Sequence, residues 1–111
     1  MTDQGSIAEI QVDELRALSD AGAVVVDVRM PDEYLEAHVP GALLTALPEI
    51  PERHGEIPAT DTVYVICRSG ARSLKACEFL VGSGRSAVNV TGGTMAWIEA
   101  GHPAATGSEP G

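Results

Sequence analysis

Residues 63–73 read Val-Tyr-Val-Ile-Cys-Arg-Ser-Gly-Ala-Arg-Ser. Four apolar residues that favour β-structure lead directly to Cys67, small polar and cationic residues follow, and an apolar helical pattern begins near Ala71. This order predicts a buried strand, a tight turn and the start of a helix. The thiol of Cys67 is expected at the mouth of the turn.

The predicted turn has the chemistry of an anion site. Gly70 allows several backbone N–H groups to point at one spot, and the start of the helix adds unpaired N–H groups and the positive end of its dipole. Arg68, Arg72 and Lys75 add full positive charges. Such surroundings favour the thiolate of Cys67 over the thiol, and the thiolate is the reactive form.

Strand and helix patterns alternate along the rest of the chain. Strands are expected near residues 7–10, 23–28, 42–46 and 87–90, and helices over 12–18, from Pro31, from Ala71 to Gly82 and over 94–100. The alternation predicts an α/β fold with a mostly parallel central sheet flanked by helices. Cys67 would then lie at the carboxyl end of a strand, where such sheets carry their sites.

Two details of these elements are also expected. Residues 47–60 contain three prolines, which predicts irregular structure with at most one helical turn. In the helix after the turn, Leu74, Cys77 and Val81 are spaced to form one apolar face, which favours a core position for Cys77 over a role as a second reactive thiol.

Length and composition predict one globular domain. The chain has 111 residues, and we expect the domain to span 7–105 between flexible termini at 1–6 and 106–111. No apolar run approaches the ~20 residues that cross a bilayer. The first residues do not form a secretory signal either. We therefore expect a cytoplasmic protein without a membrane partner.

The charge is unevenly distributed. The formal net charge is −9, but residues 62–98 carry four basic residues and only one acidic residue. A small cationic region on an acidic protein suits a small anion, and a long basic face for nucleic acid is missing. Two cysteines and three scattered histidines do not have metal-ligand spacing, so we expect neither a metal nor a cofactor.

The chain resembles a single-domain rhodanese, a sulfurtransferase. Three ordered blocks carry the resemblance: Val26-Asp27-Val28-Arg29 with Glu33-Tyr34 and His38-Val39-Pro40-Gly41-Ala42; Cys67-Arg68-Ser69-Gly70-Ala71-Arg72-Ser73; and Gly92-Gly93 with Ala96-Trp97 and Gly101-His102-Pro103. Together they span nearly the whole chain, which makes them more specific than any one motif. Ala37 stands where the family usually has glycine, so we expect a small adjustment of the helix end there.

The resemblance implies a two-step transfer of sulfur. Cys67 would attack the outer sulfur of an anionic donor such as thiosulfate, and a thiophilic acceptor such as cyanide or a thiol would then remove that sulfur from the Cys67 persulfide. Arg68 would bind the donor or be a solvated surface arginine, and the two stay open. Ser69, Gly70, Ala71 and Ser73 would contribute mainly N–H groups. For Arg72, donor binding and bracing of the loop against an acidic residue both stay open.

Other residues of the three blocks are expected to be structural. Asp27 and Arg29 are expected to form an ion pair or a turn cap rather than to act in catalysis. His38 is expected to be a hydrogen-bonded structural histidine. Trp97 is expected in the core, where it could also shield the loop.

Two other functions are compatible with parts of the same sequence pattern. A persulfide carrier or binding module that relays sulfur to a partner protein has the same sequence features as the enzyme. A phosphatase is disfavoured, because the arginine of phosphatases in related folds comes six residues after the cysteine, whereas Arg72 follows Cys67 by five. One residue fewer makes a smaller cradle, which suits a sulfur atom better than a tetrahedral phosphate.

Overall fold

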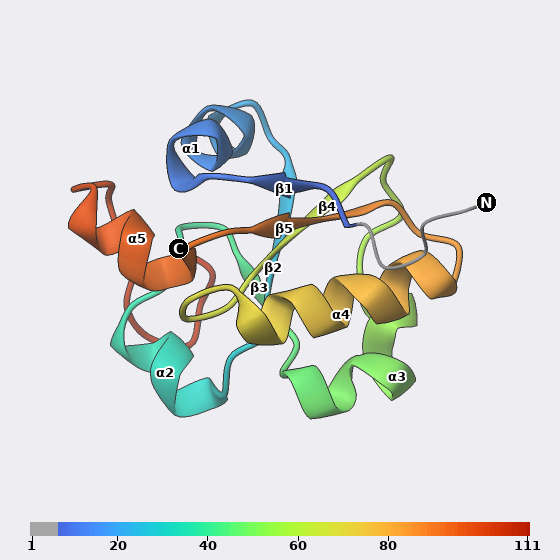
Figure 1. Ribbon diagram of the computed structural model, residues 1–111. Helices are drawn as coiled ribbons and strands as arrows, with labels where there is room; N and C mark the ends of the chain where they lie inside the picture. Colours follow the sequence, from blue (N-terminus) through green and yellow to red (C-terminus); the bar gives the residue numbers. More distant parts are fainter. Residues whose placement is uncertain (1–6) are drawn as a thin grey trace.

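The structure is a computed structural model that describes residues 7–111 (Figure 1). The flexibility expected for residues 1–6 lies outside the described residues. Five strands form one sheet in the order β1-β5-β4-β2-β3, and each neighbouring pair is parallel. The strands are β1 (Glu9–Ile10), β2 (Val24–Asp27), β3 (Leu43–Leu44), β4 (Val63–Ile66) and β5 (Ala87–Val90).

Helices cover both faces of the sheet. They are α1 (Val12–Asp20), α2 (Pro31–Glu36), α3 (Ile50–Arg53), α4 (Ala71–Gly82) and α5 (Gly93–Glu99). In Figure 1, α1 lies above the sheet, α3 and α4 lie below it, and α2 and α5 flank the end at which β4 runs into α4. The predicted α/β fold with a parallel sheet is therefore confirmed, with every strand pair parallel.

The core divides between the two faces because successive side chains of a strand point to opposite sides. Val26 and Val65 pack with Leu80 of α4 in one cluster of buried residues. Val25 and Ile66, their neighbours in sequence, pack with Trp97 of α5 in the other cluster. Both central strands are thus buried on both faces, which explains their continuous apolar sequence.

The buried face of α4 differs from the predicted one. Val81, expected in the core, is 43% exposed. Cys77 is buried as predicted, together with Leu80, Ala76 and Ser73. This set also has helical spacing, but it begins at a serine, which a reading based on hydrophobicity passes over. The burial of Ser73 brings a hydroxyl group beneath the loop.

The segment between β3 and β4 is more helical than expected. It contains 3₁₀ turns at Leu47–Glu49 and His54–Glu56 on either side of α3. Two of the prolines expected to prevent helix, Pro48 and Pro51, stand in the first turns of the first 3₁₀ helix and of α3. Proline is favoured at these positions because the first N–H groups of a helix have no partner within it.

The last residues of the chain contact the segment that follows α2. His38 and Ala105 form an isolated antiparallel bridge, and the amide of Gly41 donates to the carbonyl of Pro110 (2.8 Å). The domain boundary at residue 105 and the flexibility of 106–111 stay predictions, tested below by truncation. No helix within residues 7–111 is both long and apolar enough to span a bilayer.

Candidate active site

Cys67 is the first residue after β4, at the carboxyl end of the sheet. The four residues 67–70 turn the chain into α4, and Gly70 closes the turn with φ +116°, a conformation that favours glycine. The Gly70 amide donates to Cys67 Sγ at 3.1 Å, and the Ser73 hydroxyl lies 3.3 Å from the same sulfur. The loop therefore curls around the thiol, as the sequence predicts.

The thiol is enclosed and also activated. Cys67 is only 1% exposed. Burial is the largest single influence on the pKa of the Cys67 thiol and raises it. Hydrogen bonds from the Ser73 hydroxyl and from the amides of Ser73, Gly70 and Ser69 together outweigh burial, so that the pKa is lowered. The site thus stabilises an anionic sulfur chiefly with hydrogen bonds.

The start of α5 holds the loop from the other side. The amides of Thr94 and Met95 donate to the carbonyls of Cys67 (2.8 Å) and Arg68 (3.1 Å). A Cβ atom on Gly93 would lie 2.5 Å from these carbonyl oxygens, and the φ of Gly93 is +61°. Glycine is therefore needed at residue 93 for α5 to approach the loop this closely.

Two of the three arginines around the loop are paired with carboxylates. Arg72 forms two hydrogen bonds with Glu33 of α2, at 2.8 and 2.9 Å. Arg29 binds Asp27 in a buried ion pair with an Nη2–Oδ2 distance of 2.8 Å and also donates to the Ala37 carbonyl. The predicted pairing of Asp27 with Arg29 is present, and the geometry of Arg72 favours bracing.

Ala37 shows why its departure from the family pattern is tolerated. Its φ is −171°, which is extended backbone that any residue can adopt. Its carbonyl receives the Arg29 guanidinium at 2.7 Å. The end of α2 is therefore held by this hydrogen bond without a left-handed residue.

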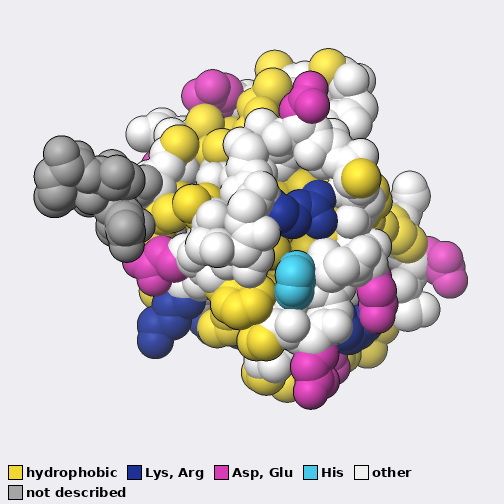
Figure 2. Space-filling model, turned by 90° about the vertical axis from the view of Figure 1, so that its right-hand side faces the viewer, with side chains coloured by type: hydrophobic (Ala, Val, Ile, Leu, Met, Phe, Trp, Pro, Cys, Tyr) yellow, Lys and Arg dark blue, Asp and Glu magenta, His cyan; other side chains and the backbone are white. Residues whose placement is uncertain are grey.

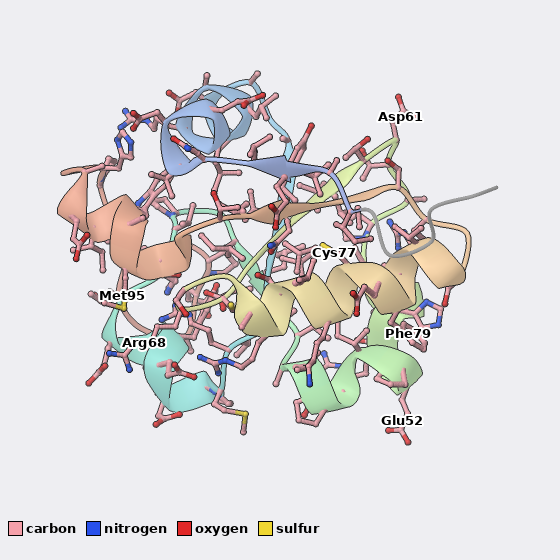
Figure 3. All side chains as sticks on the ribbon, viewed as in Figure 1. Glu52, Asp61, Arg68, Cys77, Phe79 and Met95 are labelled. Carbon is pink, nitrogen blue, oxygen red and sulfur yellow. The ribbon has the colours of Figure 1, made fainter. Side chains whose placement is uncertain are left out.

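Arg68 differs from the other two arginines. Its side chain is exposed, and the partner recorded for it among the described residues is the Met95 sulfur, 3.2 Å from Nε. The two side chains lie together at one edge of the molecule (Figure 3). A hollow of about 240 Å³ there is lined by Arg29, Glu33, Glu36, Arg68, Thr94 and Met95. Arg68 is thus the guanidinium available to an incoming anion.

Thr94 is an unexpected member of this region. It is 3% exposed, and its hydroxyl is the one buried side-chain polar atom within residues 7–111 that has no hydrogen-bond partner. A buried hydroxyl without a partner costs free energy. Thr94 directly follows the Gly92-Gly93 pair, but nothing in the sequence distinguishes it from an ordinary helix residue.

Asn89 is the second residue that sequence reasoning missed. It is 2% exposed on β5, and its side chain lies 2.5 Å from the Ser73 hydroxyl. The one available signal was a polar residue inside the otherwise apolar run Ala87–Val90. The loop residues Arg68, Ser69, Gly70, Ala71, Arg72 and Ser73 are brought together around Cys67, and their roles as binding residues stay predictions.

His38 and Trp97, two further side chains of the three blocks, are structural. His38 is fully buried, stacks on Tyr34 with ring centroids 3.7 Å apart, and has its Nδ1 2.8 Å from the Tyr34 carbonyl oxygen. Trp97 is buried, and its indole N–H donates to the Pro103 carbonyl. Its cluster lies on the sheet face opposite that of Cys67. The core positions predicted for these side chains are confirmed.

Cys77 is also a core residue, as predicted. It is fully buried between α4 and the sheet (Figure 3). Burial, aided by the charge of Glu78, raises the pKa of the Cys77 thiol to about 12. Cys77 is therefore a neutral, unreactive thiol at ordinary pH.

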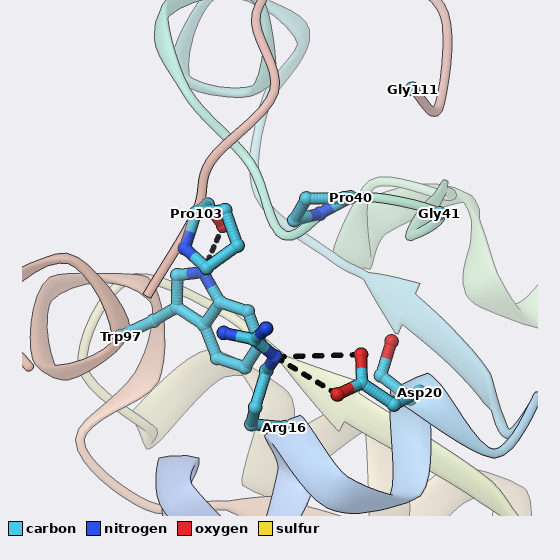
Figure 4. Close-up of a pocket in the computed structure, with 8 residues that line it drawn as sticks. Arg16, Asp20, Pro40, Gly41, Trp97, Pro103 and Gly111 are labelled. Carbon is cyan, nitrogen blue, oxygen red and sulfur yellow. Dashed lines mark hydrogen bonds and ion pairs between the residues drawn. The ribbon is translucent and has the colours of Figure 1, made fainter. Parts of the chain in front are cut away.

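Other surfaces of the molecule do not share this chemistry. A hollow of about 270 Å³ lined by Arg16, Asp20 and Trp97 is shown in Figure 4, and no residue of 67–73 lines it. Figure 2 shows the end of the molecule opposite the loop, where basic and acidic side chains are interspersed. Within residues 7–111, no three His, Cys, Asp or Glu side chains gather as a metal ion requires.

Comparison with known proteins identifies the family of the chain. The family model described as Rhodanese-like domain matches residues 11–100 of the chain. A protein named sulfurtransferase from Allochromatium vinosum is 42% identical over 72% of this chain and 76% of its own. Thiosulfate sulfurtransferase 18 of Arabidopsis thaliana is 33% identical over 93% of this chain and 87% of its own.

A solved structure shows the same fold. The rhodanese-related protein from Thermoplasma volcanium has a TM-score of 0.83 and 32% identity, and the match covers 88% of this chain and 97% of that one. The chain therefore belongs to the rhodanese-like family. Its relatives support a role in moving sulfur, either as a transferase or as a carrier.

Proposed function

We propose that the protein is a sulfurtransferase that moves a sulfane sulfur from thiosulfate, or from another persulfide donor, to a thiophilic acceptor by way of a Cys67 persulfide. The observation that carries the proposal is the convergence of N–H and O–H donors on one buried sulfur: the Gly70 amide at 3.1 Å and the Ser73 hydroxyl at 3.3 Å. Preorganised donors of this kind stabilise a sulfur anion without a neighbouring base.

The reaction has two steps. The Cys67 thiolate attacks the outer sulfur of thiosulfate, the sulfur–sulfur bond of the donor breaks, and sulfite leaves with the bonding electron pair. Cys67 then carries one additional, anionic sulfur. The acceptor attacks that outer sulfur, and the Cys67 thiolate leaves with the electrons of the persulfide bond. Cys67 is therefore nucleophile first and leaving group second.

Arg68 is the proposed contact for the sulfonate end of the donor. It lines the hollow beside Thr94 and Met95 and has no carboxylate bonded to it among the described residues. Thr94 lines the same hollow, but its hydroxyl is buried, so Arg68 is the only group proposed to contact this end of the donor. Arg72 and Arg29 remain occupied by Glu33 and Asp27.

The test is mass spectrometry of the intact protein after incubation with thiosulfate. We expect one added sulfur on Cys67, its loss on addition of cyanide with formation of thiocyanate, and no addition to Cys67→Ser. Cys77→Ser is the matched control, because that thiol is buried and protonated, and it should behave as the unaltered protein does. Absence of the added sulfur on Cys67 contradicts the proposal.

The carrier alternative is separated by turnover. Repeated turnover with thiosulfate and cyanide supports the enzyme, whereas a persulfide that forms once and passes only to a partner protein supports the carrier. Measurable hydrolysis of a phosphotyrosine analogue would instead favour a phosphatase. A cytoplasmic location also stays a prediction.

A further inference from the structure

A buried polar chain leads away from Cys67 beneath the loop. The Ser73 hydroxyl is fully buried and lies 3.3 Å from Cys67 Sγ, 3.2 Å from the Gly70 carbonyl and 2.5 Å from Asn89 Oδ1. Asn89 is on β5, and its register partner on the edge strand β1 is Glu9. This series of polar contacts therefore connects the thiol to an edge of the sheet that is remote in sequence.

The orientation of the Asn89 amide is fixed by its other partners. Asn89 Nδ2 donates to Glu9 Oε2 at 2.9 Å and to the Gly70 carbonyl at 3.3 Å. A carboxylate and a carbonyl can only accept, so the nitrogen of the amide must face them. Asn89 Oδ1 must then face Ser73, where it too can only accept.

The Ser73 hydroxyl consequently has one proton and three acceptors. Of the two oxygen acceptors, Asn89 Oδ1 is nearer than the Gly70 carbonyl, and a neutral thiol sulfur is a weaker acceptor than either oxygen. While Cys67 is a neutral thiol, the Ser73 hydroxyl donates its proton in a hydrogen bond to Asn89 Oδ1. A lone pair of the Ser73 oxygen then faces the sulfur. An anionic sulfur is a stronger acceptor than a neutral amide, so it draws the proton to itself.

We propose that Asn89, held in place by Glu9, is a positioning residue for Cys67: it withholds the Ser73 proton from the neutral thiol and releases it to the sulfur when the sulfur is charged. No covalent bond breaks in this step. The hydroxyl group turns about its C–O bond and exchanges the hydrogen bond to Asn89 for one to the sulfur. The relevance of the device to catalysis rests on the proposed function, since a turning hydroxyl suits a sulfur that alternates between nucleophile and leaving group.

The other charged groups near the thiol form ion pairs that do not include Ser73 or Asn89. Asp27 of β2 is paired with Arg29, and Arg72 of α4 is paired with Glu33 of α2. Cys77 of α4 is neutral, and Thr94 and Met95 of α5 carry no charge. Variants of Asn89 and Ser73 leave these groups and the formal charge unchanged. Asn89→Leu also removes the hydrogen bond to the Glu9 carboxylate, and measuring its effect with and without the Ser73 hydroxyl separates that change from the effect of the hydroxyl.

The test measures the pKa of the Cys67 thiol in the full chain from the pH dependence of its alkylation by iodoacetamide, with the modified peptide identified by mass spectrometry. Removing the acceptor in Asn89→Leu frees the hydroxyl for the thiolate, and we expect the pKa to fall by about half a unit to one unit. Ser73→Ala should raise it. In the Ser73→Ala background, Asn89→Leu should cause no further shift.

Two further variants complete the design. Thr91→Val is the matched control. It removes another side-chain hydrogen bond to β1, from the Thr91 hydroxyl just after β5 to the Ile10 carbonyl (3.1 Å), and leaves Ser73 unaltered, so the pKa should not move. If Asn89→Leu does not fold, Asn89→Val, whose β-branched side chain suits a strand, gives the same readout.

The proposal is overturned if the pKa in the Asn89 variant rises or stays unchanged, or if it shifts equally with and without the Ser73 hydroxyl. The alkylation assay needs no sulfur donor. A failure of thiosulfate to load Cys67 therefore refutes the proposed function alone, whereas the thiol titration refutes the role of Asn89 alone.

Discussion

The three arginines near the Cys67 thiol differ in their partners, and the partner of each arginine limits what else it can bind. Arg29 is buried against Asp27, Arg72 is half-buried against Glu33, and Arg68 is exposed beside the Met95 sulfur. A guanidinium already bound to a carboxylate by two hydrogen bonds has little left for a substrate. At the scale of single residues, Arg68 is therefore the arginine for which we propose donor binding.

The first prediction concerns this residue. Arg68→Ala removes the one guanidinium of the hollow that is not bound to a carboxylate, and we expect the KM for thiosulfate to rise about tenfold with a modest change in kcat. Arg53→Ala is the matched control: it removes one positive charge from a surface arginine paired with Glu49 and Glu56. Steady-state kinetics of the two variants test this, and an unchanged KM in Arg68→Ala rejects the role.

At the scale of elements, the site is a junction of one strand end and three helices. Arg72, in the first turn of α4, is bound to Glu33 of α2, and the first amides of α5 are bound to the carbonyls of Cys67 and Arg68. The loop is thus held from two sides by contacts between elements. Each of these contacts gives a prediction about stability.

The ion pair between α2 and α4 predicts a pH dependence. The hydrogen bond from Arg72 is the main reason that the pKa of Glu33 falls from the usual 4.5 to about 2, against the opposing effect of burial. A lowered pKa in the folded state stabilises the fold above pH 4.5, and this contribution disappears as the pH falls toward 2. Because both side chains are partly exposed, we expect a contribution of about 1 kcal/mol.

Urea unfolding of the unaltered protein and of Glu33→Gln measures this contribution. The variant should be less stable at pH 7, and the difference between the two proteins should shrink as the pH is lowered from about 5 to about 2. Glu36→Gln removes a carboxylate from the same helix and serves as the control. A difference that is independent of pH would contradict the role of the ion pair.

The contact between α5 and the loop predicts a requirement for glycine. In Gly93→Ala a methyl group meets the Cys67 and Arg68 backbone at 2.5 Å, in a conformation with φ +61°. We expect the free energy of unfolding to fall by about 2 kcal/mol or more, because backbone atoms cannot move aside cheaply. The same measurement on Gly82→Ala, in α4 with open space around its Cβ position, should show little loss or a small gain. Equal stability of the two variants would show that α5 adjusts freely.

At the scale of the whole molecule, the sequence predicts the framework well and long-range polar contacts poorly. The apolar runs before Asp27 and Cys67 identify the central strands, and the position of Cys67 at a strand end follows from the parallel sheet. The partnership of Asn89 with Ser73 could not be read in this way, because β5 and the start of α4 meet only after the sheet forms. The prediction that Val81 is buried was wrong, because hydrophobicity alone does not reveal that the buried face of α4 includes Ser73.

The end of the chain gives the last prediction, because its contacts and its composition point in opposite directions. Residues 106–111 read as a flexible tail. In the structure, however, the carbonyls of Glu109 and Pro110 lie 3.0 and 3.1 Å from Nε2 of the fully buried His38, and the Gly107 amide donates to the Leu35 carbonyl at 2.9 Å. Removing residues 106–111 leaves one ring nitrogen of His38 without its acceptors.

A buried polar atom that loses its hydrogen-bond partner lowers the free energy of unfolding by roughly 1–3 kcal/mol. The loss is smaller where water can bond to that atom once the tail has been removed. We therefore expect a chain ending at Ala105 to unfold at lower urea concentration, with the loss reduced when His38 is first replaced by Phe, which has no ring nitrogen to satisfy. The α1 variant Arg16→Ala, which breaks an exposed ion pair with Asp20, marks the size of an ordinary surface change. If truncation costs no more than that variant, the last six residues are flexible and the domain ends at residue 105. If it costs more and His38→Phe cancels the difference, these residues are part of the fold, since they provide the acceptors that the buried imidazole requires.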